Sequence, residues 1–262
     1  MNIIVCIKQV PDTTEIKIDP IKNTLIRTGV PSIMNPFDKN ALETGLQLKD
    51  TYGGKVTVLS MGPPQAKAVL REALSMGADE AYLVTDRAFG GSDTYATSYI
   101  LSQAIKKLGE FDVILGGKQA IDGDTGQTAP SIAEHLQAVR LTYVLDLKTQ
   151  GDKVIVRRQV EEGIEIIETS FPLLCTATKE SNKPRYATIR RKIASLEADI
   201  PSITLADLPD ADPSKMGLKG SPTKVKATFT PKRSANGVFI QEASPKETAI
   251  SLLSKLADAK IL

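Results

Sequence analysis

Short apolar runs alternate with amphipathic segments along the first 140 residues of the chain. The apolar runs have the length of β-strands and lie at 2–8, 55–61, 81–85 and 111–117. The segments that follow them carry apolar residues at helical spacing, over 36–49, 64–76, 93–108 and about 128–137. Strands that alternate with helices of this length pair in parallel through βαβ crossovers. The pattern therefore predicts an α/β fold built on a mostly parallel sheet.

Polar residues typical of helix starts support these boundaries. Ser92 or Asp93 is expected to cap the helix that begins near residue 93. Close to the C-terminus, Ser244, Pro245 and Glu247 have the spacing of a capping box. We therefore predict a terminal helix from residue 244 onward, and its apolar side chains need a surface to cover.

The pattern changes after residue 142. Residues 154–159 and 164–169 alternate strictly between apolar and polar positions around the turn 161–163, which predicts a β-hairpin. A further strand is expected at 173–177. Residues 208–236 are rich in Pro, Lys, Ser and Thr and contain few large apolar groups, so they predict an extended arm.

These elements suggest a division into two parts. We expect an α/β domain over residues 1–207, including the hairpin at 153–170. The rest, 208–262, is expected to be a C-terminal arm that ends in a helix. Such an arm could fold back on the chain or embrace a partner chain, and its length favours the second.

Composition and charge narrow the function classes. The 262 residues are 41% hydrophobic and 24% charged, which is ordinary for a globular protein. The formal net charge is +2, and no basic block accompanies aromatic residues, so we expect no nucleic-acid partner. The longest apolar runs are strand-sized, so no membrane insertion is expected. The first residues have neither a secretory nor a transit pattern, and the expected location is cytoplasmic.

Few side chains offer catalytic or metal-binding chemistry. The two cysteines, Cys6 and Cys175, lie in apolar runs without CxxC spacing, so they are expected to be buried thiols rather than metal ligands. The single histidine, His135, lies in a helical pattern and is expected to be a half-exposed helix residue. With one histidine and no activated nucleophile beside it, hydrolytic catalysis is not expected. We assign no catalytic side chain.

The most informative stretch is the loop GGKQAIDGDTGQTAP at 116–130. It follows a buried strand and opens a helix, which is where open α/β sheets bind ligands. Its glycines let the backbone approach a ligand closely, and Thr125, Gln127 and Thr128 add donors where the helix dipole favours phosphate. Asp122 and Asp124 suit a ribose hydroxyl or a helix cap better. The alternative interpretation is an ordinary Gly/Asp turn.

Other segments are candidates for the same site. The residues CIKQVPD at 6–12 end the first strand, and Asn35 with Pro36 begins the first long helix. Asn35 as an N-cap explains that pair without any ligand, so only convergence with the loop would make it functional. The run FGGSDT at 89–94 has some similarity to the SGGxDS loop of ATP pyrophosphatases, but a helix cap is the preferred interpretation.

Taken together, the chain resembles the β subunit of electron transfer flavoproteins along nearly its whole length. The matching motifs are IKQVPD, NPFDKNALE, SMGPPQA, GGKQAIDGDTGQT, VRRQVEEGIEIIETSFPLLCTAT and NKPRYATI. The resemblance implies a Rossmann-like, adenine nucleotide α-hydrolase-like fold and a heterodimer with an FAD-carrying α subunit, on which the C-terminal arm and helix would pack. By motif, it implies a cofactor site formed by Cys6, Asn35, Pro36, Phe37, Asp38, Met61, Asp122, Gly123, Asp124, Thr125, Gly126, Gln127, Thr128, Ala129, Pro130 and Ser131.

The loop also bears on which branch of the family the chain resembles. AMP-binding members have consecutive acidic residues followed by Asn-Gln, whereas this chain has DGDTGQ at 122–127. Gly123 removes a side chain where a longer cofactor would pass. The resemblance is therefore to the electron-bifurcating branch. It implies an FAD that accepts hydride from NADH and sends electrons to ferredoxin or flavodoxin and, through the α-subunit FAD, to an acyl-CoA dehydrogenase.

Two alternatives stay open on the sequence. One is an AMP-binding structural subunit of a non-bifurcating electron transfer flavoprotein. The other is a free-standing nucleotide sensor or ATP pyrophosphatase, against which the incomplete SGGxDS motif and the arm both argue.

The segment 182–200 resembles the part of the family that docks dehydrogenases, centred on 183–196. Family members carry an apolar anchor before the residue that matches Asn182, whereas this chain has Ser181. The alternative interpretation of the segment is a basic, helical, solvent-facing surface.

Overall fold

The computed structural model describes residues 1–12, 31–151, 153–227 and 237–262. The described residues divide into two compact units, with the boundary after Lys226. The larger unit contains the sheet and the candidate site. The smaller contains the terminal helix α7 (Pro245–Asp258).

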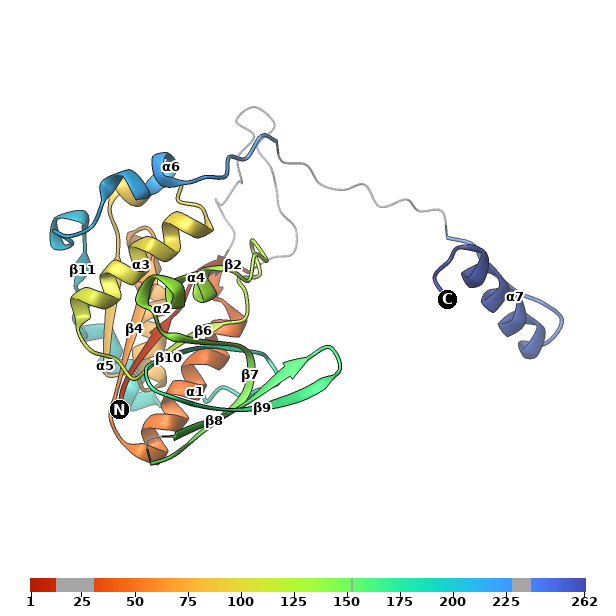
Figure 1. Ribbon diagram of the computed structural model, residues 1–262, viewed down its shortest axis with the longest axis horizontal. Helices are drawn as coiled ribbons and strands as arrows, with labels where there is room; N and C mark the ends of the chain where they lie inside the picture. The colour runs from red at the N-terminus through yellow and green to blue at the C-terminus, as the bar shows by residue number, and fades with distance from the viewer. Residues whose placement is uncertain (13–30, 152, 228–236) are drawn as a thin grey trace. The chain divides into compact units, whose positions relative to one another are not determined.

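The larger unit is built on a nine-stranded sheet in the order β11-β5-β4-β1-β6-β10-β7-β8-β9. From β11 to β7 all neighbouring strands pair in parallel, and β8 and β9 continue the sheet antiparallel. This confirms the predicted α/β fold with a mostly parallel sheet (Figure 1). The parallel strands are β1 (Asn2–Cys6), β4 (Lys55–Met61), β5 (Glu80–Val84), β6 (Val113–Gly117), β7 (Val139–Gln150), β10 (Leu173–Ala177) and β11 (Ser202–Ile203).

Both faces of the parallel strands are buried, which explains their continuous apolar runs. On β1, Ile3 and Val5 face one core cluster, and Ile4 faces the other. The first cluster includes residues of α1 (Pro36–Tyr52) and α2 (Lys67–Met76), and the second includes residues of α3 (Thr94–Leu108) and α4 (Thr128–Leu136). The sheet is therefore the middle of three layers.

Helix ends follow the local sequence signals. Asp93 caps α3, accepting the backbone N–H of Ala96 at 3.1 Å, which confirms one of the two predicted caps. Ser244 caps α7 by accepting the N–H of Glu247 at 3.3 Å, as predicted. Short 3-10 turns lead into or out of other elements, at Pro64–Ala66 (η1) and Arg87–Phe89 (η2).

The hairpin predicted around 161–163 is present. It consists of β8 (Lys153–Val160) and β9 (Gly163–Ser170), paired from Val160 opposite Gly163 outward. Its partner β7 was not predicted, because the alternation along β7 is interrupted by a register shift between Val144 and Asp146. A small second sheet pairs β2 (Gln9–Pro11) with β3 (Ser32–Met34).

The expectation of an extended arm from residue 208 is wrong for the segment up to 223. Leu208, Ala211 and Met216 are buried in the same core cluster as α3, and the hydroxyl of Tyr99 accepts the N–H of Asp212 at 2.8 Å. A few well-spaced apolar residues are enough to anchor a polar segment whose average composition predicts an arm. This segment follows η3 (Leu205–Asp207) and contains η4 (Pro213–Lys215) and α6 (Gly217–Gly220). Part of the expected arm, 228–236, lies outside the described residues.

In the smaller unit, α7 carries exposed apolar side chains, among them Ile250, Leu252 and Leu253. Among the helices that the structure describes, none is both long and apolar enough to cross a membrane.

Candidate functional site

A cavity of about 980 Å³ opens at the carboxyl ends of β1, β4, β5 and β6. Strands β4 and β6 lie on opposite sides of β1, and β5 lies beyond β4. The chain order along the sheet therefore reverses beside β1. In open α/β sheets, the connections at such a point run to opposite faces and leave a crevice that binds ligands. The cavity lies where the sequence placed the candidate site.

The structure brings most of the sequence-predicted residues together, but not all. Cys6, Asp38, Met61 and the whole stretch 116–129 line the cavity, and so do residues 7–11. The end of the first strand and the loop therefore line the same cavity, as the sequence required for a shared site. Five residues of the predicted set do not line it: Asn35, Pro36, Phe37, Pro130 and Ser131.

Asn35 supports the loop from behind. It precedes α1, as expected of an N-cap, but its side chain does not cap that helix. Its amide instead donates from Nδ2 to the carbonyl of Gln119 at 2.8 Å and accepts the N–H of Ile121 at Oδ1 at 3.2 Å. Fully buried, Asn35 thus fixes the loop backbone and contributes to the site indirectly.

Asp38 joins three elements at the base of the cavity. Its Oδ2 accepts the N–H of Lys8, after β1, at 2.7 Å, and its Oδ1 accepts the N–H of Gly117, at the end of β6, at 2.9 Å. Burial raises the pKa of Asp38 to about 7, although the bonds from Asn35, Lys8 and Gly117 act in the opposite direction. A titratable carboxyl therefore sits at the cavity base.

Gly117 allows this close approach. A Cβ at this position would lie 2.4 Å from Oδ1 of Asp38 and 2.7 Å from the backbone of α1. No side chain fits between β6 and α1 here, so the glycine is required by the fold. Gly123 is different: a Cβ there would meet nothing within 4 Å, and its φ lies outside the left-handed region. Neither strain nor packing within the described chain requires a glycine at 123.

Polar contacts hold the exposed part of the loop. The carboxylate of Asp122 pairs with Nζ of Lys8 at 2.6 Å, and Asp124 accepts from Nε2 of Gln119 at 2.8 Å. The helix-capping role considered for these two aspartates is wrong, since α4 begins after Gln127 and has no side-chain cap. The start of α4 therefore faces the cavity with its dipole uncompensated by a capping side chain, an arrangement that favours an anion.

Sequence reasoning missed one wall of the cavity. Thr85 and Asp86 follow β5, residues 90–93 lead into α3, and Thr94 and Thr97 lie in its first turn. All of them line the cavity. The rule that ligands bind at strand carboxyl ends would have identified Thr85 and Asp86. The sequence favours a helix cap for the run 89–94. In the structure Asp93 does cap α3, and the whole run also lines the cavity.

The two thiols and the histidine are accounted for by packing. Burial raises the pKa of Cys175 to about 12, and burial together with Asp38 raises the pKa of Cys6 to about 12, so neither is a reactive thiolate. His135 is half-buried on α4, with its ring edge-on to Tyr95 and Tyr99. The expectations for Cys175 and His135 are confirmed, whereas Cys6 is half-buried and lines the cavity.

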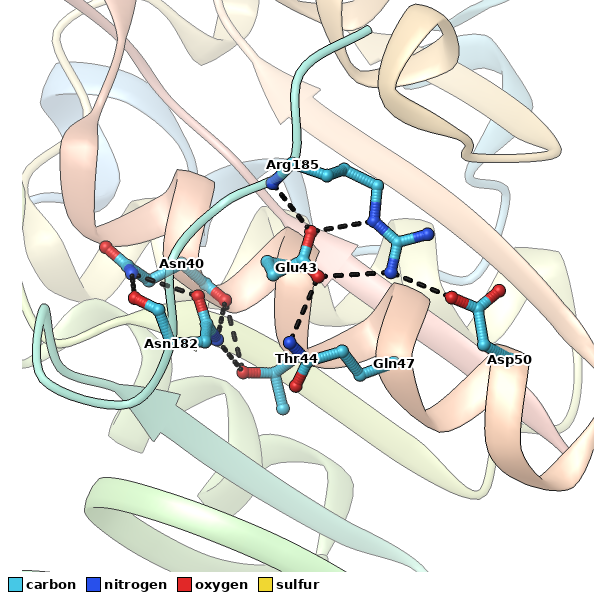
Figure 2. A network of polar contacts seen from close by, with 7 residues as sticks. All are labelled: Asn40, Glu43, Thr44, Gln47, Asp50, Asn182 and Arg185. Carbon is cyan, nitrogen blue, oxygen red and sulfur yellow. Dashed lines mark hydrogen bonds and ion pairs between the residues drawn. The ribbon is translucent and has the colours of Figure 1, made fainter. Parts of the chain in front are cut away.

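A second polar cluster anchors the predicted docking segment to the outer side of α1 (Figure 2). Glu43 is 4% exposed, and its carboxylate accepts from the backbone N–H, Nε and Nη2 of Arg185 at 2.8–3.0 Å. Nη2 of Arg185 also contacts Asp50 at 2.8 Å. Asn40 and Asn182 exchange side-chain bonds at 2.9–3.0 Å. An irregular segment is thereby held in one conformation by charged and amide groups.

Beyond this cluster the chain forms α5 (Ile189–Glu197). Its carbonyl end is held by Arg71 of α2, whose Nη1 donates to Ser195 at 2.7 Å. Ile189, Ile193 and Leu196 are spaced four and three residues apart, hence on one face, and are 60–82% exposed. The segment is therefore not only a basic surface, because it presents an apolar face as well.

Comparisons with known proteins show which family the chain is similar to. Residues 22–208 match the electron transfer flavoprotein domain family. The chain is 53% identical to the electron transfer flavoprotein subunit beta of Clostridium acetobutylicum over 258 residues, covering 98% of each chain. It is 49% identical to the caffeyl-CoA reductase-Etf complex subunit CarD of Acetobacterium woodii over the full length of both. It is 45% identical to the protein FixA of Azotobacter vinelandii, covering 98% of this chain and 94% of the relative.

The raised pKa of Asp38 predicts a pH-dependent stability. With a folded value of about 7 against an ordinary value of 3.8, the folded chain holds this proton more tightly. The stabilisation is complete below about pH 4 and is lost as the pH rises to about 7. Relative to Asp38→Asn, the wild-type free energy of unfolding should fall by up to about 1.4 kcal/mol per pH unit in this window. Urea unfolding from pH 5 to pH 8 measures it, and a constant difference would contradict the assignment.

The same substitution at the two loop glycines should change stability by different amounts. Gly117→Ala places a methyl group against the backbone of α1 and should destabilise the chain by about 2 kcal/mol. Gly123→Ala, the matched control, meets open space and should change stability by less than about 0.5 kcal/mol. Thermal and urea unfolding of both variants test this, and equal effects would show that the contact between β6 and α1 is not the cause.

Arg185 should matter more than its partial exposure suggests. Arg185→Met leaves the buried carboxylate of Glu43 without its main donors, and we expect a loss of about 3 kcal/mol in the free energy of unfolding. Arg190→Met, at an exposed position of α5, is the control and should have little effect. Similar losses in the two variants would argue against an organising role for the cluster.

Proposed function

This chain belongs to the electron transfer flavoprotein family as a β subunit, and we propose that it binds FAD in the cavity beside β1. Its role is electron transfer. In the proposed reaction NADH delivers hydride to the complex, and the electrons divide between ferredoxin or flavodoxin and an acyl-CoA dehydrogenase, the latter through the FAD of an α subunit. The proposed setting is the cytoplasm.

The single observation that favours FAD over AMP as the bound nucleotide is the open space around Gly123. The residue lines the cavity, yet neither its backbone angles nor any neighbour in the described chain requires a glycine. A small residue that the fold does not need is explained by a ligand that passes close to it. The cavity volume of about 980 Å³ is at the upper end for small-molecule sites, which suits a ligand longer than AMP.

The residues present fit the diphosphate of such a cofactor. The start of α4 has no side-chain cap, so its free N–H groups and dipole are available to phosphate oxygens. Gly126, with a φ of 61°, turns the loop just before this helix. Of the predicted set, the residues of 122–129 would hold the nucleotide, with Cys6 and Met61 packing against it. Asn35 and Asp38 would keep the loop in place.

Bound FAD would supply hydride acceptance from NADH followed by one-electron transfer in two directions. The chain's own residues position the cofactor and shape its surroundings. Asp38 holds the end of β1 against the end of β6, and the ion pair of Lys8 with Asp122 neutralises a carboxylate that would otherwise repel phosphate. No side chain is assigned as a catalytic acid or base.

Partners follow from the same proposal. The exposed apolar side chains of α7 fit a segment that packs on an α subunit. One relative is named as a subunit of a caffeyl-CoA reductase-Etf complex, which supports a partner that acts on acyl-CoA substrates. The segment 182–200, fixed by the Glu43–Arg185 cluster, is the proposed docking site for that dehydrogenase.

Nucleotide extraction from the purified heterodimer tests the proposal. We expect two FAD per heterodimer and bleaching of flavin absorbance on addition of NADH. One FAD together with one AMP would overturn the proposal in favour of an AMP-binding structural subunit. Recovery of a nucleotide-free chain that hydrolyses ATP would favour an ATP pyrophosphatase.

Variants at Gly123 sharpen the same experiment. Gly123→Leu should lower FAD content at least tenfold while leaving unfolding unchanged, because the side chain enters space that the fold leaves open. Gly123→Ala is the matched control and should retain most of the FAD. Full FAD content in the leucine variant would mean that Gly123 does not distinguish the two nucleotides.

A further inference from the structure

The segment Gly217–Thr223, called the strap below, lies against the loop 88–93 that forms one wall of the cavity. Gly217 has a φ of 61°, and a Cβ there would lie 2.3 Å from the carbonyl oxygen of Ala88. A Cβ on Gly91 would lie 2.6 Å from the side chain of Leu218. Strap and loop are therefore in contact at two glycines. Gly217 leaves no room for a side chain because it faces the backbone of Ala88, whereas Gly91 faces the side chain of Leu218.

Hydroxyl groups join the two segments. Oγ of Ser92 accepts the N–H of Gly217 at 3.0 Å and donates to the carbonyl of Phe89 at 2.8 Å. The buried hydroxyl of Ser221 accepts the N–H of Asp93 at 2.8 Å and donates to the carbonyl of Gly217 at 2.7 Å. Each hydroxyl satisfies groups on both sides of the contact, so neither segment is fully hydrogen-bonded without the other.

Asp93 is at the centre of this arrangement. Its Oδ1 accepts the N–H of Ala96 and so caps α3. Its Oδ2 accepts both the N–H of Thr223 at 3.0 Å and the hydroxyl of Thr223 at 2.8 Å. One carboxylate therefore connects the first turn of α3 with the end of the strap. The cap alone would need only one of its oxygens.

The same loop faces the cavity from its other side. Gly90, Gly91, Ser92, Asp93 and Thr94 all line the cavity. Displacement of the strap would remove two hydrogen bonds from the carboxylate of Asp93 and the acceptor from its N–H. The wall would then lose the contacts that define its shape.

We propose that Asp93 is a positioning residue of the nucleotide site, and that docking of the strap and binding of the nucleotide stabilise each other. This inference rests on the proposed function, since it takes the cavity to be the nucleotide site. Thermodynamic linkage makes the effect reciprocal: a docked strap raises nucleotide affinity, and bound nucleotide stabilises the docked strap by the same factor. The smaller unit begins at Ala227, four residues beyond Thr223.

The test uses the full chain, stripped of nucleotide and titrated separately with FAD and with AMP. Thr223→Val removes the hydroxyl donor to Asp93 but leaves the backbone N–H bond, so the variant should fold normally. It should bind the nucleotide that the wild type prefers about threefold more weakly. Ser221→Ala with Thr223→Val should weaken this binding about tenfold. In the wild type, saturating nucleotide should slow amide hydrogen exchange of residues 217–223 severalfold, an effect that a merely structural role would not produce.

The control is Thr51→Val, which removes a comparable hydroxyl bond, from Thr51 to the carbonyl of Gln47, at the far end of α1. It should leave nucleotide affinity and strap exchange unchanged. This inference alone would be overturned if the double variant bound nucleotide as tightly as the wild type and if nucleotide did not change amide hydrogen exchange of the strap. Failure of the wild type to bind either nucleotide would overturn the proposed function and this inference with it.

Discussion

The contact on which the candidate site depends is the buried carboxylate of Asp38. It lies where the chain order of the sheet reverses, and it binds the backbone N–H groups that follow β1 and end β6. The two strands pair in parallel as far as Cys6 opposite Gly116, and beyond this point the chain leaves toward different connections. The shared carboxylate acceptor extends the contact past the last strand pair, to Lys8 and Gly117. Burial makes the charged form costly, as the raised pKa of Asp38 shows. Asp38 therefore gives the crevice a defined shape, and the cost is the burial of a carboxylate.

Helix α1 contacts both the candidate cavity and the proposed docking segment. Its start supplies Asn35 and Asp38 to the base of the cavity, and its middle supplies Asn40 and Glu43 to the cluster that anchors the docking segment (Figure 2). The helix packs on β1 and β6 so closely that a Cβ on Gly45 would lie 3.2–3.3 Å from three side chains of those strands. The candidate cavity and the proposed docking segment are therefore both held by the same helix.

Much of the site was predictable from local sequence. The glycine-rich loop follows a buried strand and precedes a helix, and this order alone placed Asp122–Ala129 at the strand ends. The end of the first strand, with Cys6, and the start of the first long helix, with Asp38, were candidates from the residues themselves. The motif resemblance added Met61, and all three residues line the cavity. The wall made by residues 90–94 and the strap was not predicted. Its residues are separated by more than 120 positions in the chain, and each is explained locally by a cap or a turn.

The sequence by itself determined the elements: strand and helix periods, the caps at Asp93 and Ser244, and the hairpin at 161–163 all arise from interactions between near neighbours. It also determined the family, because ordered motifs extend along the whole chain. Only the tertiary structure decided which polar groups are buried together. Asn35 proved to hold a loop rather than cap a helix, and the segment after Leu208 proved to pack on α3 rather than extend. The physical reason is that burial depends on strand order and distant contacts, which hydrophobic periodicity within a segment does not specify.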